Sequence, residues 1–389
     1  MKTVVLMVHN RYLLRGGEDA SFEAEVELLR EHGHEVILYE ESNERIADMS
    51  RLRAFCRTTW SAESYRKVSA LIVKHHPDIM HVQNFFPLIS PSIHHAASRR
   101  KIPVVQSLRN YRLMCPNALF LRNGMVCEDC LGKTFPWPGI RYACYRDCRP
   151  ATAAVACMIA AHRFAGTWRR HVARFVALTE FSRQKFVEGG FSEDSVVVRK
   201  NFIPDPGPSE NEERNGGLFV GMLHPWKGAH VLLEAWQKRP EAPDLTIVGD
   251  GPEKGTLRAF ADPRVRFPGI LRSRELNAKL KKALFLVFPS VWYETFGRTI
   301  IEAFACGTPV IASRLGAAAD LVSDHETGLH FTPGDPDDLA EKIHWAVANP
   351  DAMRRMGQRA RREYERKYTP DVAYGSLMAI YRDAMGIQA

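Results

Sequence analysis

The sequence predicts an α/β protein made of two doubly wound domains, and three observations support this prediction. The chain has 389 residues, and at roughly 150 residues per domain this length is enough for two sizeable cores. Short β-branched runs alternate with helical stretches through both halves, which is the pattern of parallel strands joined by helices. A segment rich in Pro, Gly and charged residues, 204–216, separates the two halves and is expected to be a linker.

The first half carries the clearest helix of the chain. Phe22, Val26 and Leu29 recur on one helical face, directly after a first apolar strand. Further β-branched runs follow at intervals, so we assign residues 1–203 to an N-terminal domain with a cysteine-bearing insertion at about 111–150. The expected strands of this domain are 3–9, 34–40, 78–84, 103–108, 174–180 and 195–201.

The second half repeats the alternation after the linker. Asp335 is placed to cap a helix whose first residue, Pro336, has the fixed φ that suits a helix start. A closing helix is expected to begin near Pro370. We assign residues 217–368 to a C-terminal domain and 369–389 to the closing helix. The expected strands are 217–223, 244–250, 265–270, 283–290 and 309–315.

Composition and charge narrow the class of protein. With 45% hydrophobic and 25% charged residues, the chain is not a disordered, collagen-like or disulfide-dense protein. The net charge is +8, and residues 99–203 carry 18 Lys and Arg against 7 Asp and Glu. Such a local excess attracts anionic lipid headgroups, phosphorylated substrates or nucleic acid, although a solvated basic surface fits it equally well.

Membrane and targeting signals are weak. No stretch approaches the roughly 18–20 apolar residues that span a bilayer, and the best candidate, 151–161, ends at His162 and Arg163. The N-terminal apolar run lacks the longer core and cleavage site of a secretory signal. We therefore expect a cytoplasmic protein.

The loop and helix within residues 288–313 hold the richest chemistry. Glu294 lies in a loop after a strand, Gly297 precedes a helix, and Glu302 lies one turn into that helix. Free backbone N–H groups at such a helix start suit a phosphate, and the two carboxylates can accept hydrogen bonds from sugar hydroxyls. Two surface glutamates that flank a helix start fit the same spacing.

This segment resembles the E-x7-E signature of retaining glycosyltransferases of family 4. Glu294 and Glu302 have the required spacing, and other runs of the family occur in family order. The resemblance implies the GT-B fold, in which two Rossmann-like domains face a central cleft. It also implies that the C-terminal domain binds a nucleotide-diphosphate sugar, that the N-terminal domain binds the acceptor, and that the last helix crosses back to the N-terminal domain. The other runs are at Gly16-Gly17, 177–183, 221–228, 247–253 and 328–340.

The resemblance further implies which residues bind the donor. Lys227 would hold a phosphate, Gly249 and Gly251 would let the backbone approach the donor, and Ile270 and Leu271 would lie beside the nucleobase. Each of these residues taken alone also fits a solvated lysine or an ordinary turn. The remaining donor-binding residues are Gly16 and Gly17, which would close on the diphosphate, and Gly221, Phe296, Gly297, Arg298 and Thr299.

The family also implies a mechanism. Its members retain the anomeric configuration, pictured as attack on the face from which the diphosphate departs, with assistance from that leaving phosphate. Stabilising the leaving group is then the main task of the protein. Because no D-x-D metal motif lies in a suitable loop, we expect transfer without a catalytic cofactor.

Two positions depart from the family pattern. Met222 stands where the family has a phosphate-binding arginine, and we expect Arg298 to supply the missing charge, unless it is a solvated helix residue. Arg109 stands where many relatives have the active-site histidine. Arginine cannot act as a neutral base near pH 7, but it can bind the donor sugar or the diphosphate. The other candidate catalytic groups are Glu294, His81 and His9, although a strand-end histidine is commonly structural.

The insertion carries a cysteine constellation. Cys127 and Cys130, followed by Cys144 and Cys148, have the spacing of a structural zinc site, and a cytosolic chain seldom uses disulfides. Four thiolates on one zinc ion would order a segment that lacks a core. Reduced thiols are the main alternative, and disulfides are a second one.

Together these features predict a glycosyltransferase that moves a sugar from a nucleotide-diphosphate sugar to a glycan or lipid-linked acceptor, in bacterial surface polysaccharide synthesis. A nucleotide-sugar epimerase and a non-catalytic glycan-binding protein are the alternatives. No nucleic-acid partner is expected. A peripheral position on the inner membrane face is left open, because the apolar helix from Ala151 is followed by arginines; a buried core helix with a basic end fits the same pattern.

Overall fold

Within the residues that the structure describes, each half of the chain forms one six-stranded parallel sheet. The structure is a computed structural model and describes residues 2–13, 16–209 and 213–387. Residues 210–212 of the predicted linker lie outside the described part. The chain divides into an N-terminal unit (Met1–Phe120, Cys127–Asn201 and Ala373–Ala389) and a C-terminal unit (Leu121–Val126 and Phe202–Val372). The predicted fold class, α/β with two Rossmann-like domains, is confirmed.

The sheet of the N-terminal unit is doubly wound around its first strand. Its strands are β1 (Val4–Arg11), β2 (Glu35–Ser42), β3 (Ile79–Val82), β4 (Val104–Leu108), β7 (Arg174–Ala177) and β8 (Val196–Val198). They lie in the order β2-β1-β3-β4-β7-β8, and neighbouring strands run parallel. Val5 of β1 pairs with Val36 on one side and Ile79 on the other. The strand order therefore reverses between β1 and β3.

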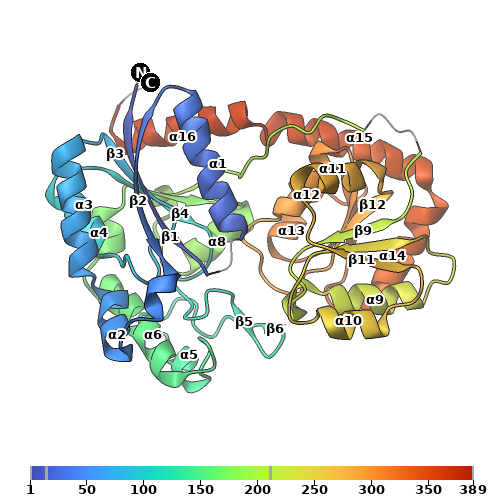
Figure 1. The fold of residues 1–389 in the computed structure, drawn as a ribbon, viewed down its shortest axis with the longest axis horizontal. Helices are drawn as coiled ribbons and strands as arrows, with labels where there is room; N and C mark the ends of the chain where they lie inside the picture. The colour runs from blue at the N-terminus through green and yellow to red at the C-terminus, as the bar shows by residue number, and fades with distance from the viewer. Residues whose placement is uncertain (1, 14–15, 210–212, 388–389) are drawn as a thin grey trace. The chain divides into compact units, whose positions relative to one another are not determined.

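Helices cover this sheet, and the last helix of the chain is one of them (Figure 1). Leu377 and Tyr381 of α16 belong to the same hydrophobic cluster as Phe22, Val26 and Leu29 of α1. The amphipathic pattern predicted for the first helix is thus confirmed. The helices are α1 (Gly17–Glu31), α2 (Arg51–Thr59), α3 (Ala62–His75), α4 (Ser92–Arg99), α5 (Trp137–Arg141), α6 (Arg149–Phe164), α7 (Thr167–His171), α8 (Glu180–Glu188) and α16 (Pro370–Ala384), with 3-10 turns at Asn43–Ile46 and Glu193–Ser195.

The C-terminal unit repeats this plan with a different strand order. Its strands are β9 (Gly217–Val220), β10 (Leu245–Val248), β11 (Val265–Gly269), β12 (Phe285–Phe288), β13 (Val310–Ser313) and β14 (Gly328–Phe331), in the order β11-β10-β9-β12-β13-β14. Asp335 caps its helix as predicted, by accepting from the N–H groups of Asp337 and Asp338. The helices are α9 (Ala229–Gln237), α10 (Lys254–Phe260), α11 (Ser273–Lys282), α12 (Arg298–Ala305), α13 (Gly316–Leu321), α14 (Pro336–Ala348) and α15 (Pro350–Lys367), with a 3-10 turn at Pro225–Lys227.

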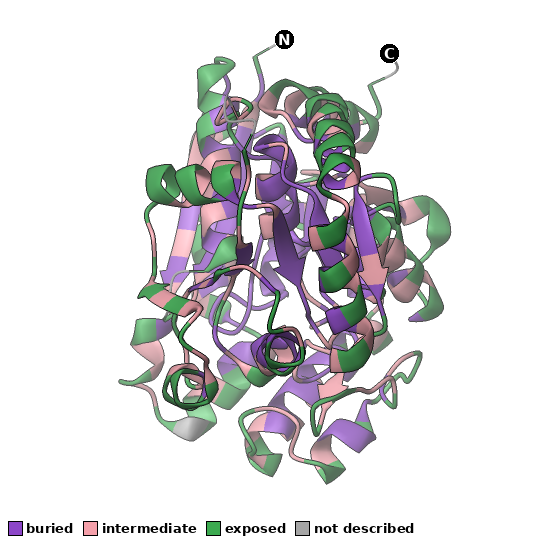
Figure 2. Cartoon of the chain, turned by 90° about the vertical axis from the view of Figure 1, so that its right-hand side faces the viewer, coloured by how far each residue is buried: buried purple, intermediate pink, exposed green. Residues whose placement is uncertain are grey.

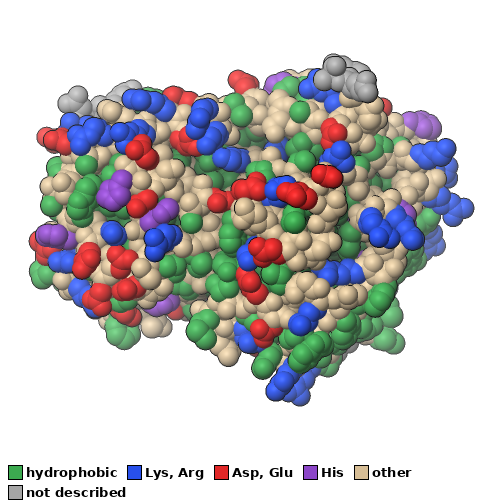
Figure 3. All heavy atoms as spheres, turned by 180° about the vertical axis from the view of Figure 1, so that it is seen from behind, with side chains coloured by type: hydrophobic (Ala, Val, Ile, Leu, Met, Phe, Trp, Pro, Cys, Tyr) green, Lys and Arg blue, Asp and Glu red, His purple; other side chains and the backbone are tan. Residues whose placement is uncertain are grey.

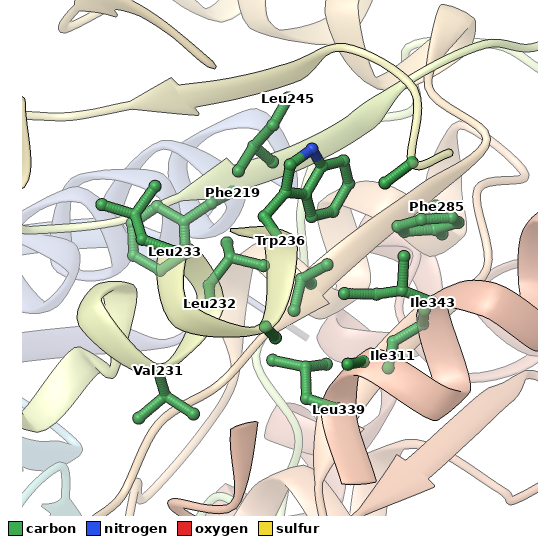
Figure 4. Packing of buried hydrophobic residues seen from close by; sticks show 14 of the residues in the cluster. Phe219, Val231, Leu232, Leu233, Trp236, Leu245, Phe285, Ile311, Leu339 and Ile343 are labelled. Carbon is green, nitrogen blue, oxygen red and sulfur yellow. The ribbon is translucent and has the colours of Figure 1, made fainter. Parts of the chain in front are cut away.

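The core of the C-terminal unit forms where α9 and α14 pack on the sheet. Trp236 of α9 is fully buried among Phe219, Leu245 and Phe285, as Figure 4 shows. Its indole N–H still donates to the carbonyl oxygen of Pro243 at 3.0 Å, so burial leaves no polar atom of the ring unpaired. Figure 2 shows that the strands are largely buried and that the helices around them expose their outer faces.

The predicted insertion is a loop segment with little regular structure. It contains a hairpin, β5 (Leu121–Arg122) and β6 (Met125–Val126), and the short helix α5. The following helix α6 buries eight of its side chains, among them Val155 and Ile159, as a core helix does. Within the described ranges, every helix is too short or too polar to cross a bilayer.

Candidate functional site

The strand order of the C-terminal sheet reverses between β9 and β12, and ligands of open parallel sheets bind outside the carboxyl ends of the strands at such a point. β9 leads into the loop 221–228, and β12 leads into the loop 289–297. Lys227 lies on the first loop and Glu294 lies on the second. The topology therefore brings these two predicted site residues to one edge of one sheet.

Lys227 and Glu294 form an ion pair at this edge. The Nζ atom of Lys227 lies 2.5 Å from Oε1 of Glu294, whose side chain is 8% exposed. The same carboxylate oxygen accepts hydrogen bonds from Ser290 Oγ at 2.8 Å and Trp292 Nε1 at 3.1 Å. The Lys227 ammonium also lies 5.5 Å from the centre of the Trp292 ring. Three donors, one of them the Lys227 ammonium group, thus hold the Glu294 carboxylate in one orientation.

Two glycines let the loops at this edge approach each other. A Cβ on Gly228, which has φ of +72°, would lie 1.9 Å from the carbonyl oxygen of Pro289. A Cβ on Gly249, with φ of +142°, would lie 1.9 Å from the carbonyl oxygen of Gly221. Any side chain at either position would separate the loops. Gly228 therefore keeps its neighbour Lys227 close to the loop that carries Glu294.

Helix α12 carries the second predicted carboxylate. It begins at Arg298 after Gly297, and no side chain caps its first N–H groups. Arg298 Nε donates to Glu302 Oε1 at 3.0 Å. Burial raises the pKa of Glu302, and the charge of Arg298 opposes this shift. Thr299 is half-buried in the first turn, whereas the Phe296 ring is buried and faces Tyr368, so Phe296 can offer a ligand only its backbone.

Arg298 has an unused donor. Its Nη1 atom is buried and has no hydrogen-bond partner among the described residues, whereas its Nε atom is paired with Glu302. Buried guanidinium nitrogens normally have acceptors, so this atom is suited to an anionic ligand oxygen. The predicted phosphate role of Arg298 stays a prediction, and this orphaned donor is compatible with it.

Apolar side chains are exposed at the same edge. Ile270, which follows β11, is 78% exposed, and Met222, which follows β9, is 49% exposed. Leu271 is partly exposed. The loop of Met222 is joined to the loop after β10, because Leu223 N donates to the carbonyl oxygen of Asp250, next to Gly251, at 2.9 Å. That loop is joined in turn to the end of β11, because Gly249 N donates to the carbonyl oxygen of Gly269 at 3.0 Å. Exposed apolar side chains beside polar groups suit the flat face of a nucleobase.

The Gly16-Gly17 loop opens helix α1 in the N-terminal unit. Gly16 N donates to Asp19 Oδ2 at 3.0 Å, and the other Asp19 oxygen lies 2.9 Å from His9 Nε2. Among the described residues, no atom outside the chain neighbours lies within 4 Å of a Cβ built on Gly16 or Gly17. Their predicted role at the diphosphate stays a prediction. His9 is fully buried and bonded to Asp19, so we interpret it as a residue that supports the loop rather than one that contacts a substrate.

His81, a predicted catalytic candidate, is fully buried, and its catalytic role stays a prediction. Its side chain is 0% exposed, and its two ring nitrogens lie 2.8 Å from Tyr381 Oη and 2.9 Å from Ser107 Oγ. Burial lowers the pKa of His81 to about 4, so the ring is neutral near pH 7. A ring with both nitrogens occupied inside the sheet would have to break these bonds to reach a substrate. In the structure, His81 ties β3 and β4 to α16.

Arg109 points into the N-terminal unit. Its Nε atom donates to Gln83 Oε1 at 2.7 Å, its Nη1 atom donates to Asn201 Oδ1 at 3.1 Å, and its Nη2 atom lies 4.0 Å from Glu25. Arg109 as a whole is 6% exposed to solvent. The direct contact with the donor that the sequence suggests would require these bonds to break. The predicted catalytic role of Arg109 stays a prediction.

Arg109 belongs to a buried network that the sequence did not indicate. Glu25 of α1 accepts from Arg199 Nη1 at 2.5 Å and from Gln83 Nε2 at 2.6 Å. Burial alone would raise the pKa of Glu25, but Arg199, His81 and Arg109 together lower it to about 2. Arg199 also donates to the carbonyl oxygen of Ala373. The network therefore joins two parts of the N-terminal unit that are far apart in the sequence: the part that ends at Asn201 and the part that begins at Ala373.

The cysteines of the insertion are free thiols in this structure. Cys130 is buried, and burial raises its pKa to about 12, with nearby cysteines adding to the shift. Among the described residues, no three His, Cys, Asp or Glu side chains are arranged to hold a metal ion. Cys127, Cys130, Cys144 and Cys148 thus form no preformed metal centre here, and zinc binding stays a prediction.

Comparison with known proteins identifies the class to which the C-terminal unit is related. Residues 205–363 match the family model "Glycosyl transferases group 1". The D-rhamnosyltransferase WbpZ of Pseudomonas aeruginosa is 32% identical over 158 residues, which are 39% of this chain and 41% of that protein. The O-antigen chain mannosyltransferase C of Escherichia coli is 30% identical over 170 residues, 42% of this chain and 45% of that protein. The chain thus matches less than half the length of these curated relatives.

Solved structures share the fold over nearly the whole chain. Alr3699/HepE of Anabaena, solved in complex with UDP, has a TM-score of 0.70 at 17% identity and is matched over 98% of this chain and 99% of its own. The sucrose-phosphate synthase of Thermosynechococcus elongatus has a TM-score of 0.71 at 16% identity, with both chains matched in full. These likenesses establish the GT-B fold of two Rossmann-like domains.

Sequence reasoning missed three groups of the C-terminal site. Gly228 follows Lys227 in the same run, and its contact with Pro289 could have been suspected from that run alone. Ser290 and Trp292 lie between the strand end and Glu294, where a hydroxyl and an indole N–H are natural partners for a carboxylate. The sequence offered no signal that both would bond the same oxygen.

Proposed function

We propose that the protein is a retaining glycosyltransferase that transfers a sugar from a nucleotide-diphosphate sugar to a glycan or lipid-linked glycan acceptor of a bacterial surface polysaccharide. The observation that carries this proposal is the pairing of Lys227 with Glu294 at the switch point of the C-terminal sheet, beside Glu302 on α12. The group 1 match of residues 205–363 supports it, as do the names of the two relatives, a D-rhamnosyltransferase and an O-antigen chain mannosyltransferase.

Each polar residue of the C-terminal site has one role in this proposal. Glu302 accepts hydrogen bonds from the ribose hydroxyls, and Glu294 accepts them from the donor sugar. Lys227 and the unpaired Nη1 atom of Arg298 bind the diphosphate, aided by the start of α12. Ile270 and Met222 line the side of the nucleobase. The role of Gly16 and Gly17 at the diphosphate stays a prediction from the sequence.

The proposed transfer needs no catalytic metal. The acceptor hydroxyl oxygen bonds to the anomeric carbon on the face from which the diphosphate leaves, and the bond between that carbon and the diphosphate oxygen breaks. The hydroxyl proton passes to the leaving diphosphate. The cations Lys227 and Arg298 stabilise the negative charge that develops there. Arg109 and Glu25 act by positioning the edge of the N-terminal sheet, and neither serves as a catalytic acid or base.

A thermal-shift screen of the purified chain against UDP, GDP, ADP and their sugars tests this proposal. A ligand that binds only the folded state raises Tm by mass action. We expect a rise with one nucleotide that Glu302→Ala abolishes, followed by release of that nucleotide when the donor sugar and a glycan extract are added. No response to any nucleotide at millimolar concentration would overturn the proposal and favour a non-catalytic glycan-binding protein.

A further inference from the structure

An apolar cavity opens beside the carboxyl edge of the N-terminal sheet. Its volume is about 720 Å³, within the range of ligand sites. It is lined by Ile46 and Met49, which follow β2, by Phe86 and Leu88, which follow β3, and by α2 and α6, which pack against each other. The cavity thus lies at the sheet edge where ligands of parallel sheets bind.

The mouth of the cavity exposes large apolar side chains. Leu52 of α2 is 74% exposed, and Phe55 on the same helix is 37% exposed. Both line the cavity. Figure 3 shows hydrophobic side chains gathered in the region of α2, α5 and α6, with Lys and Arg side chains at the margin. Soluble proteins seldom expose apolar groups together in this way unless something binds them.

The charged side chains described at the cavity are cationic. Arg146 is the one charged side chain among its described lining residues. Arg112 lies over two lining rings, 4.2 Å from the centre of Phe86 and 5.0 Å from that of Tyr145. A smaller pocket, lined by Arg112 and Arg109 at the ends of β3 and β4, shares Phe86 with the cavity. An apolar cavity therefore adjoins a basic one.

We infer that this cavity binds the hydrocarbon chain of an anionic amphiphile, with its phosphate held by Arg146 and Arg112. Apolar walls favour the chain, and the guanidinium groups favour the phosphate. This inference rests on the proposed function, because it makes the acceptor a lipid-linked phosphate rather than a free glycan. The basic excess of residues 99–203 is consistent with such a ligand.

Dodecyl phosphate below its critical micelle concentration is the probe that tests the inference, with dodecanol and inorganic phosphate as matched probes. Calorimetric titration of the full chain should give saturable binding of dodecyl phosphate. Dodecanol should bind more weakly, and inorganic phosphate should neither bind nor compete. Equal binding of dodecanol would overturn the phosphate contact, and full competition by inorganic phosphate would overturn the chain site.

Two charge substitutions on exposed apolar residues locate the binding. Leu52→Asp places a carboxylate at the cavity mouth and should weaken dodecyl phosphate binding by about tenfold or more. Phe164→Asp is the matched control, because Phe164 is 78% exposed on α6 and does not line the cavity. Arg146→Gln should reduce the preference for dodecyl phosphate over dodecanol. Equal losses in Leu52→Asp and Phe164→Asp would overturn the site.

Nucleotide binding, measured on the same preparations, separates this inference from the proposed function. Leu52 is not among the residues proposed to bind the nucleotide, so Leu52→Asp should leave the nucleotide-induced rise in Tm unchanged. Loss of amphiphile binding with intact nucleotide binding in that variant supports the cavity. A wild-type chain that binds nucleotide but not dodecyl phosphate overturns the cavity alone. A chain that binds dodecyl phosphate but no nucleotide overturns the proposed function alone.

Discussion

The ammonium group of Lys227 lies 2.5 Å from the carboxylate of Glu294, although 67 positions separate the two residues in the sequence. The pair connects the loops that follow the two central strands of the C-terminal sheet. It therefore couples the proposed phosphate ligand to the proposed sugar ligand. A donor that inserts its diphosphate beside Lys227 must share that cation with Glu294.

Lys227→Met should weaken both stability and nucleotide binding. Glu294 then loses its cation while it is still mostly buried, so the free energy of unfolding should fall by about 1–3 kcal/mol. The Kd for the nucleotide should rise by about tenfold or more. The double variant Lys227→Met/Glu294→Gln should recover stability in urea titrations but not nucleotide binding. Recovery of binding in the double variant would contradict a phosphate role for Lys227.

Glu302→Gln should remove the preference for an intact ribose. The carboxylate can accept from two ribose hydroxyls, whereas an amide offers one acceptor oxygen. Titrations should show that the wild type binds the nucleotide more tightly than its 2′,3′-dideoxy analogue, and that this preference shrinks in Glu302→Gln. Glu234→Gln on the exposed face of α9 makes the same charge change away from the site and serves as the control. An unaltered preference in Glu302→Gln would rule out the ribose contact.

Arg199→Met should destabilise the N-terminal unit strongly. Glu25 is 1% exposed and would be left without its main cation, which typically costs about 3–5 kcal/mol. Arg183→Met is the control, because Arg183 pairs with the surface residues Glu180 and Glu193 and its loss should change the stability only slightly. Chemical denaturation of both variants measures the difference. Similar small losses in the two would mean that the buried network does not stabilise the unit.

Stability should fall as the solution is acidified, in two windows. The pKa of His81 is lowered from 6.5 to about 4, so between these values the unfolded chain binds a proton that the folded chain does not. Each pKa unit corresponds to about 1.4 kcal/mol. The pKa of Glu25 is lowered from 4.5 to about 2, so its contribution is present above pH 4.5 and is lost as the pH falls toward 2.

Urea denaturation across pH 4 to 7 checks the first window. His81→Gln should make the stability less dependent on pH there, without abolishing the dependence, because burial also lowers the pKa of His94 to about 4. A wild-type stability that rises on acidification from pH 6.5 would show that the sign of this assignment is wrong.

The thiols of the chain should differ widely in reactivity. Cys56 is exposed, so iodoacetamide at pH 8 should label it first. Burial raises the pKa of Cys130 to about 12 and that of Cys306 to about 11, so both should stay protonated and react slowly. Mass spectrometry of labelled peptides gives the order. Metal analysis of the same sample decides the zinc prediction, since one zinc ion per chain, released when the insertion cysteines are alkylated, would establish it.

Much of the fold could be read from local signals in the sequence. The helical spacing of apolar residues predicted α1, and residues typical of helix starts predicted the Asp335 cap and the start of α12 at Gly297. These signals are local, because helix faces and caps depend on residues only a few positions apart. The short hairpin β5–β6 and strand β14 were not predicted as strands. β5 and β6 are two residues long, too short to carry a period of their own. β14 reads Gly-Leu-His-Phe and lacks the β-branched residues that indicated the other strands.

The sequence by itself determined the two doubly wound sheets and the residues at the carboxyl edge of the second, since motif order places Lys227, Glu294 and Glu302 on loops after strands. Only the tertiary structure decided that Arg109 and His81 turn inward. Their orientation depends on partners that no local pattern connects: Glu25 and Arg199 are 174 positions apart, and Tyr381 is 300 positions from His81. A buried charge needs a partner of opposite charge, and only the packed fold determines which residue supplies it.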